Sequence, residues 1–272
     1  MISVQGHSAQ GCQGLPLQSL RFPGGEWHVR LTAPDKAAVC TQFEISALIQ
    51  NADHVMQLLM LTDALRRVAP DAKLHLHMPY VPYARQDRVA NPGEALSIRV
   101  FCDLINAQHY DRVIIQDPHS DVTSALLNRV VIASPLSALQ KVLAETGPVA
   151  LLAPDAGAHK RVAVLAKALG CSMLCAEKTR DTISGQLAAT RIQGELPELP
   201  LLVVDDICDG GGTFLALADA VRAAQQHQQI SQPLYLYVTH GIFSKGADAL
   251  LQQYQRIFTR HRWTDDSRCE VV

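Results

Sequence analysis

The chain has 272 residues, 48% of them hydrophobic, which is enough to bury the core of one large domain or two of ordinary size. A formal net charge of −2 leaves no bulk positive charge for nucleic acid, and the sequence lacks the run of about 18 apolar residues that a membrane span requires. The seven cysteines are odd in number and lie mostly in apolar surroundings, which favours reduced thiols in a cytoplasmic protein.

Short apolar runs alternate with helical patterns along the chain. The part through about Thr41 predicts short antiparallel strands. Further strands are predicted over 73–77, 112–116, 149–153, 201–204 and 234–238, and helices over 47–68, 95–107, 135–145, 158–169 and 213–228. This alternation indicates an α/β fold with two similar, doubly wound, mainly parallel-sheet domains, spanning 1–134 and 135–272.

Polar motifs follow several of the predicted strands, at 79–88, 117–119, 154–157 and 205–213. In doubly wound sheets, ligands bind beyond the carboxyl ends of the strands. The positions of these motifs therefore predict that they lie at one functional edge of each sheet.

The segment after the predicted strand 201–204 begins with two adjacent carboxylates, Asp205 and Asp206. The residues that follow lead into a predicted helix and include Asp209, Gly210, Gly211, Gly212 and Thr213. Glycines let the backbone approach an anion, and the amides at a helix start point toward it. Because carboxylates suit sugar hydroxyls, the segment predicts a site for a ribose that carries a 5-phosphate. A helix cap with solvated acids is the alternative.

A second segment, 80–88, ends in four polar residues: Arg85, Gln86, Asp87 and Arg88. The forked donors of a guanidinium group match phosphate oxygens. An isolated segment of this kind is better explained as a surface salt-bridge cluster, so its interpretation depends on the rest of the chain.

Taken together, the ordered motifs resemble those of the ribose-phosphate diphosphokinases, also called phosphoribosyl diphosphate synthetases, which have a phosphoribosyltransferase-type fold. The motifs lie at 21–26, 80–88, 117–119, 154–161, 177–180, 205–213 and 238–244. The resemblance implies an enzyme that transfers the β,γ-diphosphoryl group of Mg-ATP to the anomeric hydroxyl of ribose 5-phosphate. It also implies an ATP-binding first domain, a ribose-phosphate-binding second domain and a homo-oligomer, a dimer or higher.

The resemblance assigns roles to individual residues. ATP would be bound by Phe22, Glu26, Arg85, Gln86, Asp87, Arg88 and His119, and the acceptor by Asp205, Asp206, Asp209, Gly210, Gly211, Gly212 and Thr213. Lys178 and Arg180 would form the catalytic pair, and His119 and Asp155 would hold Mg²⁺. The residue types alone leave simpler explanations open: solvated charges for the pair, and a hydrogen-bonded histidine at a strand end for His119.

Charge placement adds two expectations. Lys178 and Arg180 are two apart, so on a strand they would project from one face. Lys160 and Arg161 open a predicted helix, where the positive end of the helix dipole disfavours cations. We therefore expect an anionic partner close to these two residues.

Two departures from the family pattern bear on the substrates. Gly24 stands where the family has an aspartate, which leaves the preference for ATP open. Gly210 stands where it has a threonine. The missing side chain predicts an opening, which suggests a 5-substituted acceptor such as ADP-ribose and a role in NAD-related metabolism. A tighter turn at glycine is the alternative, and a non-catalytic regulatory relative or a phosphoribosyltransferase are the competing functions.

Overall fold

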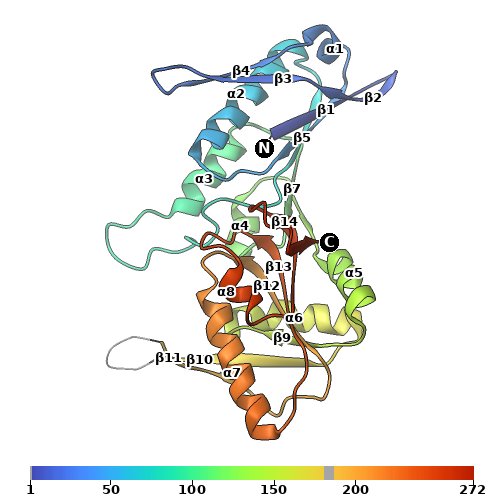
Figure 1. Ribbon diagram of the computed structural model, residues 1–272. Coiled ribbons are helices and arrows are strands. Elements are labelled where there is room, and N and C mark those ends of the chain that lie inside the picture. Colours follow the sequence, from blue (N-terminus) through green and yellow to red (C-terminus); the bar gives the residue numbers. More distant parts are fainter. Residues whose placement is uncertain (1, 181–186) are drawn as a thin grey trace. The chain divides into compact units, whose positions relative to one another are not determined.

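The computed structural model describes residues 2–180 and 187–272, which form two compact units, one up to Ala133 and one from Ser134 to Val272 (Figure 1). Both units are α/β structures with largely parallel sheets, so the predicted fold class is confirmed. Within the described ranges, no helix is long and apolar enough to cross a membrane.

The described strands of the first unit form a sheet in the order β2-β1-β5-β6-β7-β8, beside a separate antiparallel hairpin of β3 and β4. The elements are β1 (Ile2–Ser8), β2 (Gly11–Leu15), β3 (Leu17–Arg21), β4 (Trp27–Leu31), α1 (Pro34–Ala38), β5 (Gln42–Ala47), α2 (Ala52–Val68), β6 (Lys73–His77), α3 (Ser97–Asn106), β7 (Arg112–Gln116), α4 (Asp121–Leu126) and β8 (Val130–Ala133). β1 pairs antiparallel with β2 and β5, whereas β5 through β8 pair in parallel. The expected N-terminal antiparallel strands are therefore confirmed.

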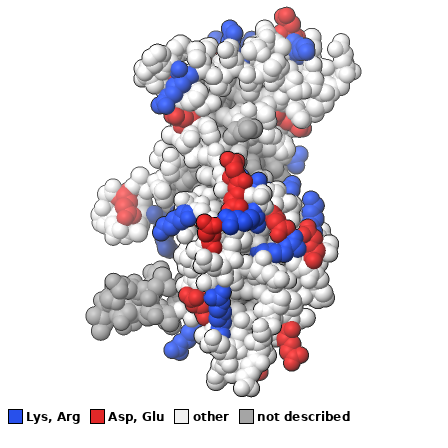
Figure 2. Space-filling view, in the orientation of Figure 1, with Lys and Arg blue, Asp and Glu red and all other residues white. Residues whose placement is uncertain are grey.

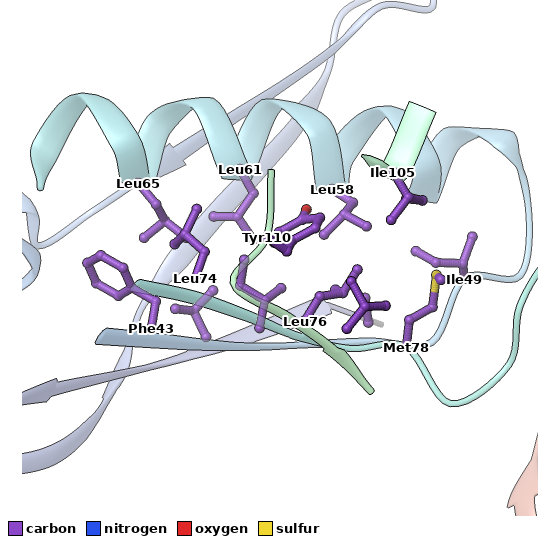
Figure 3. Close-up of a cluster of buried hydrophobic side chains, with 14 of the residues drawn as sticks. Phe43, Ile49, Leu58, Leu61, Leu65, Leu74, Leu76, Met78, Ile105 and Tyr110 are labelled. Atoms are coloured by element: carbon purple, nitrogen blue, oxygen red, sulfur yellow. The ribbon is translucent and has the colours of Figure 1, made fainter. Parts of the chain in front are cut away.

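Helix α2 covers one face of this sheet. Its buried residues Leu58, Leu61 and Leu65 are three and four apart, so they share one face of the helix. They point toward the strands that carry Phe43 and Leu74 (Figure 3), and all five side chains are at most 1% exposed. Burying each such side chain contributes about 1.5–3 kcal/mol. This packing holds the strands whose carboxyl ends carry the polar segments.

Helix caps correct two of the predicted boundaries. α2 begins at Ala52 instead of residue 47, because Asn51 caps it by accepting a hydrogen bond of 3.0 Å from the His54 amide. α6 (Ala156–Leu169) begins two residues before the predicted start, because Asp155 accepts from the Ala158 amide at 3.1 Å. Apolar spacing shows which face of a helix is buried, but the capping side chain sets where the helix begins.

The described strands of the second unit form a sheet in the order β11-β10-β9-β12-β13-β14-β15, parallel except for the β10–β11 pair. Its remaining elements are α5 (Leu136–Thr146), β9 (Ala150–Ala153), β10 (Met173–Arg180), β11 (Leu187–Ile192), β12 (Leu201–Cys208), α7 (Gly212–Gln228), β13 (Leu234–Gly241), α8 (Asp248–Leu251), β14 (Arg256–Arg262) and β15 (Cys269–Val271). The strand predicted over 201–204 thus continues for four more residues, which places both adjacent acids inside β12.

Helices cover both faces of this second sheet. Leu152 and Val203 pack with residues of α7, whereas Leu151 and Leu202 pack with residues of α5 and α6. All four strand residues are fully buried. Successive strand residues point to opposite faces, so continuous apolar runs are what a doubly covered sheet requires.

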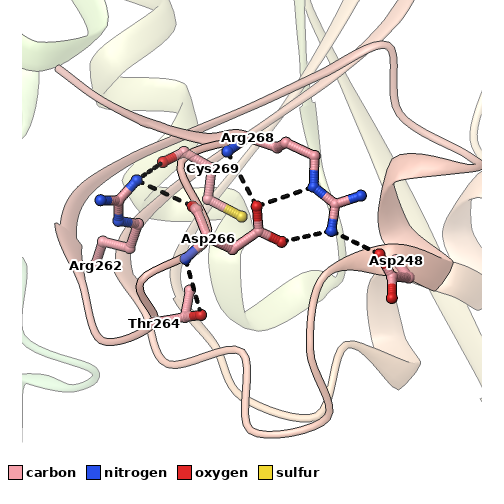
Figure 4. Close-up of polar contacts among 6 residues, drawn as sticks. All are labelled: Asp248, Arg262, Thr264, Asp266, Arg268 and Cys269. Carbon is pink, nitrogen blue, oxygen red and sulfur yellow. Dashed lines mark hydrogen bonds and ion pairs between the residues drawn. The ribbon is translucent and has the colours of Figure 1, made fainter.

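Polar contacts hold the segment between β14 and β15 (Figure 4). Arg268 donates to both carboxylate oxygens of Asp266, at 2.9 and 2.7 Å, and to Asp248 of α8 at 2.6 Å. Arg262 donates to the carbonyl oxygens of Asp266 and Cys269, at 3.0 and 3.1 Å. These bonds keep the segment after β14 beside α8.

Candidate functional site

Arg161 joins the two adjacent acids of β12. Its Nη2 atom donates to Oδ1 of Asp205 and, at 3.1 Å, to Oδ1 of Asp206. The side chains of the acids are only 16% and 4% exposed, so both lie largely out of water. The anionic partner expected near the start of this helix is confirmed for Arg161, and it is the acid pair itself.

Burial and mutual repulsion dominate the electrostatics of this acid pair. Burial, and next the charge of Asp206, raise the pKa of Asp205 well above its ordinary value, while Arg161 acts in the opposite direction. Arg161 therefore offsets only part of the cost of ionising Asp205 in this position. Hydroxyl groups that donate to the carboxylates would stabilise their ionised form, so the pair suits a sugar diol.

The glycine segment forms the start of α7. Gly211 is the N-cap in the left-handed conformation, with φ of +77°, and no acidic residue lies in the first turn. A Cβ atom at Gly211 would also lie 3.3 Å from Leu250, so glycine is favoured there by both conformation and space. Since the first amides of a helix have no partner within it, this end can receive an anion.

The segment after β13 holds this loop from the other side. The amides of Ile242 and Phe243 donate to the Cys208 carbonyl at 2.9 and 3.1 Å, and the Ser244 amide donates to the Asp209 carbonyl at 3.1 Å. Ser244 Oγ adds a bond of 2.6 Å to Asp209 Oδ1. From the sequence, Ser244 was known only as the last residue of the motif at 238–244.

Gly210 does not leave the empty space that the sequence suggested. A Cβ atom built there would lie 3.4 Å from Cε and 3.6 Å from Cδ of Lys245. The stem of a lysine therefore lines the expected opening, and the 5-substituted acceptor stays a prediction. Lys245 lies directly after the motif at 238–244, and the absence of a side chain at Gly210 was the one signal in the sequence that could have led to it.

Lys178 and Arg180, the expected catalytic pair, lie on strand β10. The register of β10 against β11 shifts between Thr179 and Arg180, where β11 has one additional residue. The side chains of 178–180 lie outside the described part of the structure, and their catalytic role stays a prediction.

In the first unit, the turn at 22–26 connects β3 to β4. The amide of Phe22 donates to the Glu26 carbonyl and the amide of Gly25 to the Phe22 carbonyl, both at 2.8 Å. Gly25 has φ of +97°, which explains the need for glycine there. Phe22 is 46% exposed and Glu26 is also exposed, so both are accessible on this turn.

The segment at 80–88 is anchored by Val81 and Ala84, each only 3% exposed. Arg85, Gln86 and Arg88 are exposed, whereas Asp87 is half-buried. An inward anchor with outward polar residues is what a ligand-binding loop on a firm scaffold requires.

The segments at 80–88 and 117–119 leave the same edge of the first sheet. The Met78 amide donates to the Ile114 carbonyl at 2.9 Å, and the Gln116 amide donates to the Pro79 carbonyl at 3.0 Å. These bonds bring the ends of β6 and β7 together. His119 follows as an exposed residue, so within this unit it shares an edge with the segment that carries Arg85.

The expected Mg²⁺ ligands belong to different units: His119 to the first and Asp155 to the second. Asp155 provides the carboxylate oxygens that Mg²⁺ prefers, and its Oδ1 already accepts from the Ala158 amide. In the part of the chain that the structure describes, no three His, Cys, Asp or Glu side chains gather as a metal site. The Mg²⁺ assignment stays a prediction.

Charged side chains of both signs are interspersed over the face shown in Figure 2, in line with the net charge of −2. The described part of this face therefore shows no broad positive patch for an anionic ligand.

Known proteins show clear similarity to this chain. Residues 7–108 match the family described as the N-terminal domain of ribose phosphate pyrophosphokinase. A ribose-phosphate pyrophosphokinase of Thermococcus kodakarensis is 31% identical over 87% of this chain and 81% of its own length. Another, of Agrobacterium fabrum, is 31% identical over 72% of this chain and 63% of its own length. The crystal structure of phosphoribosylpyrophosphate synthetase from Mycobacterium smegmatis matches with a TM-score of 0.77 at 22% identity, over 93% of this chain and 83% of that one, which supports the fold.

Proposed function

The chain belongs to the ribose-phosphate pyrophosphokinase family and is therefore a transferase, and we propose that it makes phosphoribosyl diphosphate from ATP and ribose 5-phosphate. In this reaction, the anomeric hydroxyl attacks the β-phosphorus of ATP. The bond from that phosphorus to the α,β-bridging oxygen breaks, AMP leaves, and the hydroxyl proton is released.

The observation that carries the proposal is the arrangement at the end of β12. Two buried acids, Asp205 and Asp206, precede a helix start with no acid in its first turn. The acids suit the 2- and 3-hydroxyls of a ribose, and the helix start suits its 5-phosphate. One bound acceptor would therefore contact the acids through its hydroxyls and the helix start through its phosphate.

The other roles follow the family motifs. Arg85 and Arg88 would bind the phosphates of ATP, with Gln86, Asp87 and His119 beside them, and Phe22 and Glu26 would contact the adenine. Lys178 and Arg180 would stabilise charge on the transferring group. Mg²⁺, held with Asp155 and His119, would neutralise phosphate charge when bound. Catalysis would then rest on positioning and electrostatics.

AMP release from ATP, measured with and without acceptors, tests this proposal. We expect AMP with ribose 5-phosphate and its loss in Lys178→Ala, with the exposed Lys141→Ala on α5 as a matched control that keeps activity. AMP with ADP-ribose alone would instead identify a 5-substituted acceptor. No AMP with either acceptor would favour a nucleotide-binding regulatory protein. The expected homo-oligomer is tested separately by light scattering.

A further inference from the structure

We propose that Lys245 supplies the ammonium group that binds the 5-phosphate of the acceptor, at the position where Gly210 has no side chain. This inference rests on the proposed function, because it names a further residue of the same acceptor site. It also specifies the acceptor class, a sugar that carries a 5-phosphate monoester.

The backbone around Lys245 is tied to the loop before α7. On one side, Ser244 binds Asp209 through its amide, at 3.1 Å, and through its hydroxyl, at 2.6 Å. On the other side, the Gly246 amide closes a turn onto the Phe243 carbonyl at 2.8 Å. Lys245 is therefore carried by a short, doubly held turn that is fixed relative to Gly210.

The side chain of Lys245 then runs along Gly210. From a Cβ atom built on Gly210, the distances to Cγ, Cδ and Cε of Lys245 are 3.9, 3.6 and 3.4 Å, so successive carbons come closer to the loop. The ammonium group lies one bond beyond Cε. A Cβ atom at 210 would be in van der Waals contact with this stem, so a residue larger than glycine would share its space with the lysine.

The local charges favour an anion at this point. Lys245 is exposed and forms no hydrogen bond or ion pair with any residue in 2–180 or 187–272. α7 has no acid in its first turn, and Asp209, the acid of this loop, is bound by Ser244. A cation beside the positive end of a helix is unfavourable without an anion. A phosphate would interact with both the ammonium group and the helix start.

The same lysine narrows the choice of acceptor. The aliphatic part of the Lys245 side chain lies beside Gly210. A bulky substituent on the 5-phosphate that extended past Gly210 would need the same space. An ammonium group is a compact charge that binds terminal phosphate oxygens well. These two points favour a monoester over an esterified phosphate such as that of ADP-ribose.

Calorimetric binding of ribose 5-phosphate to the full chain tests the inference without turnover, and steady-state kinetics test it with turnover. We expect Lys245→Gln to raise the Kd and the KM for ribose 5-phosphate roughly tenfold, the size of one lost charged hydrogen bond, with the KM for ATP unchanged. Lys245→Arg should retain most of the affinity. Lys141→Gln, which removes an exposed lysine of α5, should match the wild type.

The outcomes separate this inference from the proposed function. Normal AMP formation together with wild-type affinity in Lys245→Gln would overturn the role of Lys245 alone. Weaker binding in Lys245→Gln, with no AMP formed by the wild type, would support Lys245 and overturn the proposed reaction. A wild type that binds no ribose 5-phosphate would overturn both. Tighter binding of ADP-ribose than of ribose 5-phosphate would overturn the monoester class.

Discussion

The Nη2 atom of Arg161 lies 3.1 Å from Oδ1 of Asp206, in a contact that joins helix α6 to strand β12. The same nitrogen donates to Asp205, so one guanidinium group contacts both acids. Removing it would leave adjacent carboxylates without their guanidinium partner.

Arg161→Met should therefore lower the free energy of unfolding at pH 7 by about 3 kcal/mol, the lower end of the range for breaking a buried ion pair. Urea denaturation measures this loss. Arg222→Met is the control, because exposed Arg222 donates to the Gln252 carbonyl at 3.0 Å. An equal loss in both variants would contradict a special role for Arg161.

Asp205→Asn should stabilise the protein and weaken acceptor binding. Burial and the charge of Asp206 raise the pKa of Asp205 above its ordinary 3.8, so ionising this group costs more in the folded protein than in the unfolded chain. The stability that this group contributes is full below pH 3.8 and is lost as pH rises through the raised pKa. The variant's advantage in thermal midpoint should accordingly be larger at pH 7 than at pH 4. An advantage that does not grow with pH would refute this account.

Acid should destabilise the second unit through His261. Burial, then the charges of His240 and Arg260, lower the pKa of His261 from 6.5 to about 4. The unfolded chain therefore binds a proton that the folded protein does not, and stability falls as pH drops from 6.5 toward 4. The loss from this group is on the order of 2–3 kcal/mol. His261→Gln should flatten the pH profile of urea denaturation over this range; an unchanged slope would exclude His261 as the source.

Ser244→Ala should loosen the loop that precedes α7. The variant loses the 2.6 Å hydrogen bond from the Ser244 hydroxyl to Asp209 but keeps the hydrogen bond from the Ser244 backbone amide. The free energy lost is therefore about 1 kcal/mol. We expect the KM for ribose 5-phosphate to rise severalfold with little change in the KM for ATP. Ser124→Ala on α4, which removes an exposed hydroxyl bonded to a backbone carbonyl, is the matched control. A rise in the KM for ATP instead would place the effect elsewhere.

Gly24→Asp should restore the family's carboxylate without disturbing the fold. A Cβ atom at Gly24 would meet no other atom within 4 Å, and this glycine does not have the positive φ that disfavours a side chain. The thermal midpoint should stay within about 2 °C of the wild type, as for most surface changes. If Gly24 weakens adenine recognition, the KM for ATP should fall. A lower midpoint would show that glycine is needed for the turn.

Much of the fold followed from local patterns. The strands at 73–77 and 112–116 match β6 and β7, and the helix predicted at 213–228 begins one residue early as α7. The short edge strands β8 and β15 were not predicted. Their extended conformation depends mainly on hydrogen bonding to the neighbouring strand, and their own residues form only a weak strand pattern. The observed helix starts differ from the predicted ones, because a capping hydrogen bond determines where a helix begins and the spacing of apolar residues does not.

The sequence by itself determined the motif order, the doubly wound fold and the acid–glycine segment at 205–213, because these depend on residue type and spacing. Tertiary structure alone decided that Arg161 serves both acids, that Ser244 holds Asp209, and that Lys245 lines Gly210. Each of these contacts joins residues at least 35 positions apart. A local sequence pattern cannot predict such contacts. They form only when the parallel sheet brings the segments that follow its strands to one edge.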